Sequence, residues 1–444
     1  MSDTARLSLR LAEHQFTRAL VVPPTEQDLR LAKRLRERSM LDVRWPIGGD
    51  VEVTSGPWVG VAHFDAFDVA VEPKLVGGEL RVMRMLEYSS GIDLLRLLDV
   101  DRPLPADGGD LFELVCLLLA QEVQALIVDG ILRDYHAVDE ELGVLRGRLR
   151  HRDQYLRRFG RLDVLECTFD EFDANTPDNQ LLTVALARAA RRAAAPKTCW
   201  ALSGLHGLLG QVCQPPTADA DHYRTHITYN RRNQRYRRAH ELALIILDGL
   251  AFDDLYDTSS GRATAFLLNM NRLFESFITR LVQHALVGTD LTATTQKRLH
   301  AVVRDEQSGA TYAVLRPDLV VDGPAGPVPI DVKYKAYDTK KISTDDIYQT
   351  FLYAYALGGS DRERRAGILF PSSARSTHRL AVSPLGERTD ARIVGIGIDV
   401  PTVLDQLMGA EMETALHAVR RTVEDICGYD QPTPMMAATS SQDS

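Results

Sequence analysis

The chain has 444 residues, which at about 150 residues per domain corresponds to two or three domains. Hydrophobic residues make up 45% of it and charged residues 25%, the balance of a globular protein that can bury a core. Its 52 basic and 61 acidic side chains give a net charge of −9, which excludes a general electrostatic attraction to nucleic acid. Any contact with DNA must therefore use a local patch, a metal ion or a partner.

Neither secretion nor membrane insertion is indicated by the sequence. The longest apolar stretches, 114–119 and 242–247, are too short to cross about 30 Å of hydrocarbon. The first ten residues lack the apolar segment that a signal peptide needs. The five cysteines include no C-x-x-C pair, which argues against zinc and against a disulfide framework. We therefore expect a cytoplasmic protein without a membrane contact.

The N-terminal portion, residues 1–255, is predicted to combine a β-rich segment with helices. Between residues 41 and 75, valines and a phenylalanine alternate with other residue types, which is typical of strands. Apolar residues at helical spacing predict three helices: 80–98, 111–132 and 179–195. The last of these is expected to be capped near Asp178.

The C-terminal portion, residues 256–427, alternates between helical and strand patterns. Helices are predicted at 262–286 and 344–357. Strands are predicted over five ranges: 291–303, 312–321, 328–334, 366–371 and 392–400. This order predicts an α/β domain with a mixed sheet flanked by helices, in a chain that is α+β overall. Residues 428–444 cannot bury much surface and are expected to be disordered.

Three residues of this C-terminal portion form the strongest candidate for a catalytic site. Asp331 and Lys333 are two apart on a predicted strand, so their side chains leave the same face. A hairpin through residues 322–326 would bring Asp318, on the preceding strand, beside Asp331. Adjacent carboxylates repel each other unless a cation lies between them, and oxygen ligands suit Mg²⁺. Such a site favours phosphodiester hydrolysis, with Lys333 positioning the nucleophile or offsetting developing charge.

Helices flank this candidate site on both sides along the chain. Glu275 lies on the helix before the first strand, among apolar residues. After the site, Asp345, Gln349 and Tyr353 recur every four residues and so share one helical face. Each feature has a plain structural alternative: an acid/lysine pair on a surface hairpin, an exposed glutamate, and packing of a helix on a sheet.

The order of these motifs resembles that of the PD-(D/E)xK nucleases. More narrowly, it resembles the McrC family, the nuclease subunits of McrBC modification-dependent restriction systems. The motifs that carry the resemblance are VEPKL at 71–75, LRGRLR at 145–150, FDEFDANTPDNQ at 169–180, NRLFE at 271–275, RPD at 316–318, DVK at 331–333 and the Gln349/Tyr353 pair. Each motif alone is weak, but their order and spacing together are specific.

The resemblance implies a role for each candidate residue. Asp318, Asp331 and Glu275 match carboxylates that hold a metal ion. Lys333 matches the catalytic lysine. The metal is implied to be Mg²⁺, with Mn²⁺ as the alternative. The two remaining candidates match helix residues that support the active site or the DNA: Gln349 and Tyr353.

The same resemblance implies how the two portions divide the work. Residues 256–427 would form a PD-(D/E)xK endonuclease domain, and two such domains could pair in a homodimer that cuts both strands. Residues 1–255 would dock on a ring of McrB-like AAA+ GTPase subunits and stimulate their GTP hydrolysis. That partner would recognise and translocate DNA containing modified cytosine. The chain itself has no G-x-x-x-x-G-K-[ST] motif, so we expect it to bind no nucleotide.

Two rival functions stay open at this point. One is a non-catalytic adaptor that activates an AAA+ GTPase, and an adaptor would have no need of Asp318, Asp331 and Lys333. The other is a repair nuclease of the same fold with a different motor, which the N-terminal motifs disfavour. Co-purification with a neighbouring AAA+ protein would discriminate among the three.

A second acid-x-lysine motif lies at Glu72–Lys74 in the N-terminal portion. Pro73 between them removes a donor and argues against a central strand. No helix with a Q-x-x-x-Y pattern follows. We interpret this motif as structural.

Two arginine clusters stand out against the acidic average. Residues 146–161 hold seven arginines and one acid, and residues 224–238 hold six arginines and no acid. Both include aromatic residues, a mixture that suits phosphate contact or base stacking. It suits an acidic protein partner equally well, and a solvated helix face is the plain alternative. The net charge of −9 favours the partner.

Overall fold

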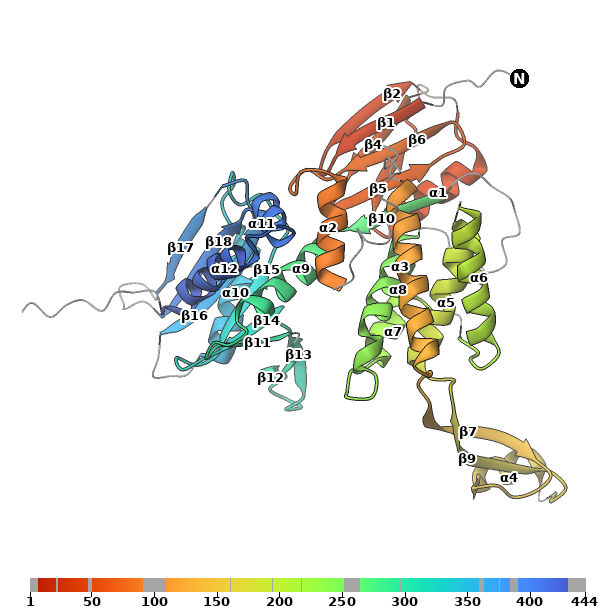
Figure 1. Ribbon diagram of the computed structural model, residues 1–444. Coiled ribbons are helices and arrows are strands. Elements are labelled where there is room, and N and C mark those ends of the chain that lie inside the picture. Colours follow the sequence, from red (N-terminus) through yellow and green to blue (C-terminus); the bar gives the residue numbers. More distant parts are fainter. Residues whose placement is uncertain are drawn as a thin grey trace, which may run out of the picture.

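A computed structural model describes residues 7–20, 23–46, 50–90, 109–159, 161–193, 195–216, 218–250, 264–295, 297–358, 363–374, 376–383 and 390–429. In these ranges the chain is a mixed α/β protein, as its patterns predict. It consists of N-terminal sheets, a helical part, a small projecting module and a C-terminal sheet with helices (Figure 1). None of the helices in these ranges is long and apolar enough to span a bilayer.

The N-terminal part consists of two sheets and a capped helix. Its elements are β1 (Leu7–Ala12), β2 (Phe16–Leu20), α1 (Glu26–Glu37), β3 (Leu41–Arg44), β4 (Asp50–Ser55), β5 (Trp58–His63) and β6 (Phe67–Glu72). One sheet has the order β2-β4-β3 and the other β1-β6-β5-β10. The alternating valines of β4 and β6 are buried in the core between them. The predicted β structure between residues 41 and 75 is confirmed.

The last strand of the second sheet, β10 (Thr264–Asn269), lies where the sequence predicts a helix. The predicted helix 262–286 is wrong over this strand and correct over α9 (Met270–Ala285). Residues 262–263 lie outside the described part of the chain. β10 pairs antiparallel with β5, so a segment beyond residue 255 completes an N-terminal sheet.

The error at β10 has a physical cause. Residues 265–268 form a short run of apolar side chains that are all buried, and such a run fits a buried strand as well as a helix. The boundary lies at Asn269, whose side chain accepts a hydrogen bond from the backbone N–H of Arg272 and caps α9. β10 therefore leads directly into the helix that carries Glu275.

The helical part follows the N-terminal sheets. Its elements are α2 (Glu79–Ser90), α3 (Gly109–Val128), α5 (Pro177–Arg192), α6 (Pro196–Gly210), α7 (Ala220–His226), the 3₁₀ turn η1 (Gln234–Tyr236) and α8 (Arg237–Gly249). The three predicted helices are confirmed here, with residues 91–98 outside the described ranges. The cap of α5 is Thr176, which accepts from Asn179 N–H, with Pro177 at the first helical position.

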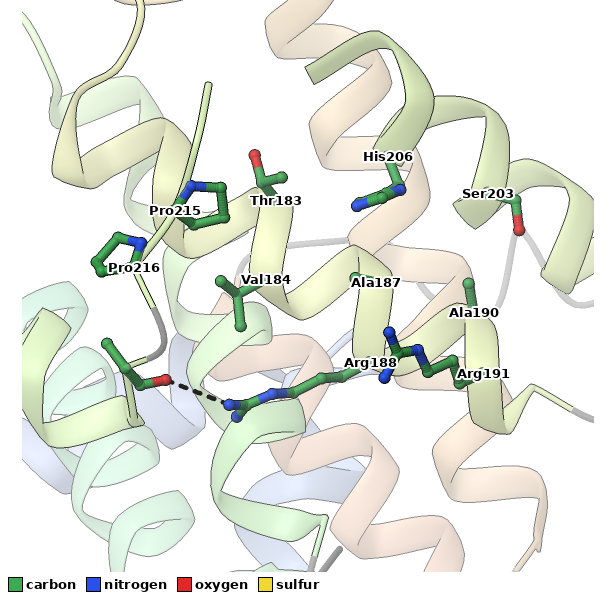
Figure 2. A pocket seen from close by; sticks show the side chains of 11 residues that line it. Thr183, Val184, Ala187, Arg188, Ala190, Arg191, Ser203, His206, Pro215 and Pro216 are labelled. Atoms are coloured by element: carbon green, nitrogen blue, oxygen red, sulfur yellow. Dashed lines mark hydrogen bonds between the residues drawn. The ribbon is translucent and has the colours of Figure 1, made fainter. Parts of the chain in front are cut away.

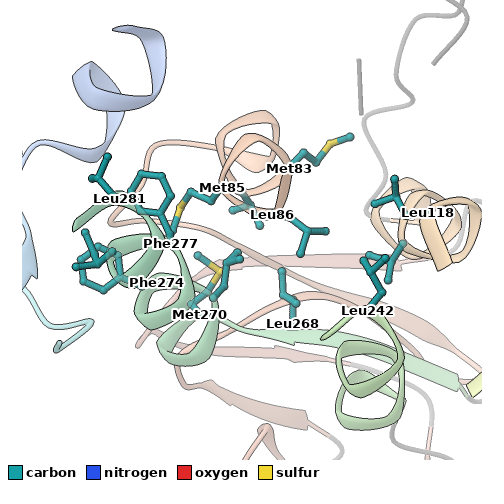
Figure 3. Packing of buried hydrophobic residues seen from close by; sticks show 14 of the residues in the cluster. Met83, Met85, Leu86, Leu118, Leu242, Leu268, Met270, Phe274, Phe277 and Leu281 are labelled. Atoms are coloured by element: carbon teal, nitrogen blue, oxygen red, sulfur yellow. The ribbon is translucent and has the colours of Figure 1, made fainter. Parts of the chain in front are cut away.

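One apolar core joins the helical part to the C-terminal part. Figure 3 shows side chains of α2, α3, α8 and α9 gathered around Leu268 of β10. The same cluster continues into the C-terminal sheet through residues such as Ile330 and Val332. α9 therefore packs on the helical part with one set of side chains and on the C-terminal sheet with another.

The projecting module extends from the end of the helical part (Figure 1). It comprises β7 (Asp134–Leu142), β8 (Arg148–Leu149), α4 (His151–Arg158) and β9 (Leu165–Asp173), with the strands in the order β7-β9-β8. It contains the arginine cluster 146–161. Tyr155 and Phe159 of this cluster are 75% and 89% exposed, so they are not part of a core.

The C-terminal part is a six-stranded mixed sheet between helices. Its elements after α9 are β11 (Thr292–Thr295), β12 (Leu299–Arg304), β13 (Thr311–Leu315), β14 (Leu319–Asp322), β15 (Val328–Val332), α10 (Thr344–Leu357), β16 (Arg364–Pro371), β17 (Thr377–Val382), β18 (Ala391–Ile398), α11 (Val400–Leu407) and α12 (Met412–Cys427). The strand order of the six-stranded sheet is β11-β14-β15-β16-β18-β17, with β15, β16 and β18 parallel, and β12 and β13 pair separately as a two-stranded sheet. α10 packs on one face of the sheet, and α9 and α12 pack on the other.

Two predicted strands are interrupted in the structure. The range 291–303 is divided between β11 and β12, and the range 312–321 between β13 and β14. The second break falls at Pro317, which has no N–H to donate to a ladder. The tail predicted to be disordered lies almost wholly in residues 430–444, outside the described part, so its disorder stays a prediction.

Candidate functional site

The hairpin of β14 and β15 brings the two aspartates together as predicted. The strands pair antiparallel with Leu319 opposite Ile330, so Asp318 and Asp331 are adjacent across the ladder. The Oδ2 atom of Asp318 accepts a hydrogen bond from the backbone N–H of Val332 at 2.7 Å. Asp331 is only 2% exposed. The predicted hairpin geometry is confirmed.

Lys333 connects this hairpin to α10. Its Nζ lies 2.8 Å from Oδ2 of Asp331 and donates a hydrogen bond to Oε1 of Gln349 at 2.9 Å. The Nε2 group of Gln349 donates to the hydroxyl of Tyr353 at 2.9 Å, and that hydroxyl donates to the carbonyl of Arg316 at 3.2 Å. A continuous chain of polar contacts therefore runs from Asp331 through α10 and back to the segment before Asp318.

One turn of α10 presents a different acid from the one that the spacing indicates. Asp345 is exposed, whereas Asp346 is buried at 5% exposure. The carboxylate of Asp346 accepts hydrogen bonds from Lys335 Nζ at 2.6 Å, from the Tyr337 hydroxyl and from Ser343 Oγ. Although burial opposes its ionisation, these hydrogen bonds lower the pKa of Asp346 below its ordinary value.

Asp346 and Lys335 are site residues that sequence reasoning did not single out. Lys335 continues the two-residue alternation of Asp331 and Lys333, and that alternation is a signal that could have identified it. Asp346 Oδ1 also lies 3.9 Å from Lys333 Nζ, so it adds to the negative charge around this lysine. Nothing in the spacing distinguishes Asp346 from Asp345, because the rotation of α10 is set by its packing on the sheet.

The carboxylates of the site disfavour one another's ionisation. Burial raises the pKa of Asp318 well above its ordinary value, and the nearby charges of Asp331 and Glu275 raise it further. Burial and Asp331 likewise raise the pKa of Glu275. For Lys333, burial opposes the charged form, but Asp331 and the other carboxylates outweigh it and raise the pKa. The site thus contains an ammonium group and an excess of acid groups.

This donor set fits a small divalent cation. The Oδ2 atom of Asp331 is buried and lies 2.8 Å from the ammonium group of Lys333. Within the described ranges, no three His, Cys, Asp or Glu side chains are arranged to enclose a metal ion. Mg²⁺ needs no such cage, since it binds through one or two carboxylates and keeps water or phosphate oxygens as its other ligands. Asp318 and Asp331 supply that pair of carboxylates.

The side chains of the second acid-x-lysine motif are not part of this arrangement. Glu72 is the last residue of β6 and forms an ion pair with Arg10 at 3.6 Å. Pro73 directly follows the strand, in agreement with its unsuitability for a ladder. The backbone of this motif instead contacts the carboxylate of Glu13.

A pocket of about 340 Å³ lies between α5 and α6, away from the candidate site (Figure 2). Arg188, Arg191 and His206 supply its basic groups, and alanine, valine and proline side chains supply most of the remaining wall. Figure 2 shows Arg188 pointing across the pocket, and its Nη2 donates to the carbonyl of Ala218 at 3.2 Å. The guanidinium is therefore engaged with Ala218.

Most arginines of the cluster 146–161 are neutralised inside the projecting module. Five of the seven form ion pairs with acids of the module: Arg146, Arg150, Arg157, Arg158 and Arg161. Arg148 and Arg152 are exposed and form no ion pair with described residues. The positive charge that is free to meet a partner is therefore smaller than the sequence count indicates.

The cluster 224–238 has a similar division. Arg232 pairs with Asp134 at 3.0 Å and donates to the carbonyl of Arg133 at 2.6 Å, and Arg235 donates to the carbonyl of Gly130. These two arginines hold the base of the projecting module. Arg231 and Arg238 are exposed and form no ion pair in the described part of the chain.

The fold and this site define a mixed α/β protein with paired carboxylates, a lysine and a glutamine at the end of a sheet hairpin. Comparison with protein families gives a match over residues 53–371 to the family described as "McrBC 5-methylcytosine restriction system component". Because the match spans well over half of the chain, the chain belongs to this family. The family that the motifs indicated is confirmed.

The chain is also similar to two solved structures from Thermococcus gammatolerans. One is a refined half-complex from a tetradecameric assembly of McrB AAA+ hexamers with bound McrC, with 18% identity, a TM-score of 0.48, and coverage of 94% of this chain and 100% of the other. The second is a cryo-EM structure of the McrBC complex, with 21% identity, a TM-score of 0.39, and coverage of 63% and 88%. No curated protein matches the chain.

Proposed function

We propose that this chain is the McrC-type subunit that cuts DNA in a GTP-dependent, modification-dependent restriction system, using Mg²⁺ or Mn²⁺. The observation that carries the proposal is the pair Asp318 and Asp331 with Lys333 at the end of β15, in a chain of the McrBC family. The substrate would be DNA with a modified cytosine of the 5-methylcytosine type, in line with the family description. Recognition of the modified base would belong to the partner.

In this proposal each side chain has a separate task. When bound, the metal ion would polarise a phosphate oxygen and lower the pKa of a coordinated water. Asp318 and Asp331 would hold it, with Glu275 adding negative charge from α9. Lys333 stays protonated at neutral pH because its pKa is raised, so we assign it stabilisation of charge on the phosphate rather than proton abstraction. Gln349 would orient the lysine through the bond to its Nζ.

The test is a DNA cleavage assay that varies the metal ion, GTP and the AAA+ partner one at a time. We expect cleavage only with a divalent cation. A chain that stimulates the partner's GTPase but does not cut DNA with any of the metal ions would instead be the adaptor. A chain that cuts, but copurifies with a different motor, would be the repair nuclease. Sedimentation of the cutting species on DNA would test the predicted homodimer.

The N-terminal 255 residues, which include the projecting module, would dock on a ring of McrB-like AAA+ subunits. One of the two solved structures is described as McrB AAA+ hexamers with bound McrC, and the other as the McrBC complex. In this chain, exposed aromatic side chains at Tyr155 and Phe159 accompany Arg148 and Arg152, which are exposed and form no ion pair within the described ranges. A surface with both aromatics and arginines suits a protein interface.

Replacing Arg148 and Arg152 by glutamine should lower stimulation of the partner's GTPase and leave the DNA affinity of the isolated chain unchanged. The two arginines are exposed, so the fold should not suffer. If they contact DNA phosphates instead, binding should weaken and the log–log salt slope should fall by roughly 0.9 per lost contact. A salt titration of DNA binding beside a GTPase assay separates these outcomes.

The matched control for the arginine variants is Lys297 and Arg298 replaced by glutamine, which removes the same charge from an exposed segment outside the proposed docking region. Arg232 is unsuitable for such a test, because its loss would loosen the base of the module. If neither DNA binding nor GTPase stimulation changes, the arginine cluster is a solvated surface that binds neither DNA nor the partner.

A divalent cation should raise the melting temperature more at mildly alkaline than at mildly acidic pH. The pKa of Asp318 is raised in the folded chain, so the folded state binds more protons than the unfolded one, and stability falls as pH rises from the ordinary aspartate value of 3.8 through the raised value. A cation replaces the lost proton and restores stability. Thermal unfolding with and without Mg²⁺ at both pH values measures this difference, and equal shifts at both would contradict it.

A further inference from the structure

A buried glutamate of the N-terminal part contacts the segment that carries the candidate site. Glu13 lies in the turn between β1 and β2 and is 1% exposed. Its Oε2 accepts a hydrogen bond from the hydroxyl of Tyr334 at 2.9 Å. Tyr334 directly follows Lys333, and its ring packs against Phe274, the neighbour of Glu275, at 5.6 Å between centroids. One hydrogen bond therefore joins the first turn of the chain to the neighbours of two site residues.

The backbone of the motif VEPKL at 71–75 hydrogen-bonds to this glutamate. The backbone N–H of Glu13 donates to the carbonyl of Glu72 at 3.2 Å. The backbone N–H groups of Lys74 and Leu75 donate to Glu13 Oε2 at 2.7 and 3.4 Å. Pro73 fixes its own φ and has no N–H, so the chain turns out of β6 with the next two N–H groups directed at the carboxylate. The motif that is not part of the metal site thus orients Glu13.

Burying the Glu13 carboxylate in this way lowers the stability of the fold. A buried carboxyl group loses its hydration, and here that burial raises the pKa of Glu13. All three donors meet the same oxygen, while Oε1 is buried without a hydrogen-bond partner in the described part of the chain. The next residue, His14, has a φ of 56°, a left-handed conformation that is uncommon outside glycine. Such costs persist where the surrounding structure holds a geometry that function needs.

We propose that Glu13 is a positioning residue for the site: by holding the Tyr334 hydroxyl, it fixes the chain end of β15 and so the place of Lys333 between Asp331 and Gln349. The proposal rests on the nuclease function proposed above and goes beyond it. Lys333 is anchored on one side by its backbone N–H, which donates to Leu369 at 2.9 Å. Tyr334 provides the second anchor, and it belongs to a contact with the N-terminal part. A shift of the β1–β2 turn would therefore move the lysine.

The mildest test is Tyr334→Phe, which keeps the ring on Phe274 and removes only the hydroxyl. We expect the turnover rate of DNA cleavage to fall, by up to about a hundredfold, because a displacement of about 1 Å at a reacting group has that effect. DNA affinity should not change, since Glu13 and Tyr334 are both buried. Glu13→Ala should give the same split between rate and affinity.

Glu13→Gln is the variant that separates positioning from charge. One amide oxygen can accept the three hydrogen bonds now made to Oε2, and the amide NH₂ takes the place of the unpartnered Oε1. We expect Gln at this position to restore cleavage to near the wild-type rate. Amide hydrogen exchange over residues 331–337 should rise in Glu13→Ala and Tyr334→Phe and stay low in Glu13→Gln.

The stability control is Thr25→Ala, which removes the cap of α1 from the same N-terminal part without touching Tyr334. If it lowers cleavage as much as Glu13→Ala does, or if Gln fails to rescue, the contact is merely structural and the inference is overturned. Wild-type cleavage by Glu13→Ala, with Lys333→Ala inactive, would also overturn it. If the wild-type chain never cuts, the nuclease proposal has failed, and the exchange measurement alone decides whether Glu13 orders residues 331–337.

Discussion

The Asp331→Asn chain should lose DNA cleavage by orders of magnitude, at least about a hundredfold, while it stays folded. The amide keeps the shape of a side chain that is 2% exposed, but it removes one of the two charges that would hold the metal ion. Asp331 raises the pKa of both Asp318 and Glu275, so its neutralisation relieves that repulsion. The free energy of unfolding should therefore stay level or rise.

Two measurements check this expectation: cleavage with metal, GTP and the partner present, and thermal unfolding of the purified chain. Asp290→Asn is the matched control, because it removes the same charge from an exposed turn after α9 and should cut like the wild type. Full cleavage by Asp331→Asn would show that Asp331 is not a residue of the catalytic site. Unfolding of the variant would point instead to a structural role for the carboxylate through its ion pair with Lys333.

The core of the candidate site could be predicted from sequence because its determinants are local. Asp331 and Lys333 share a strand face through the two-residue alternation, and a hairpin of a few residues returns the chain to Asp318. Gln349 and Tyr353 share a helical face through their spacing, and they do hydrogen-bond to each other.

The parts that could not be predicted depend on contacts between distant segments. Glu13 and Tyr334 are 321 positions apart, so no local pattern relates them. β10 was predicted as helix because its partner strand, β5, lies some two hundred residues earlier and the apolar run itself is ambiguous. The projecting module was not predicted at all, since β7 has few apolar residues and is largely exposed on both faces.

Lys333→Ala should abolish DNA cleavage and leave stimulation of the partner's GTPase unchanged. The loss of cleavage follows because the variant lacks the ammonium group that lies 2.8 Å from Asp331, to which we assign stabilisation of charge on the phosphate. GTPase stimulation should survive because the proposed docking surface lies within the N-terminal 255 residues, which include the projecting module. Lys333 lies outside that region.

The Lys333→Ala chain should also melt at a lower temperature without divalent cation, since a buried carboxylate loses its ion partner, and Mg²⁺ should recover part of that loss. Lys297→Ala, at an exposed position between β11 and β12, controls for removal of a lysine. GTPase and cleavage assays on the same preparation, with a melting curve for each variant, give the comparison. Because Glu13 and Tyr334 already connect the two parts, loss of both activities in a folded Lys333→Ala chain would mean that docking and cutting are not divided near residue 255.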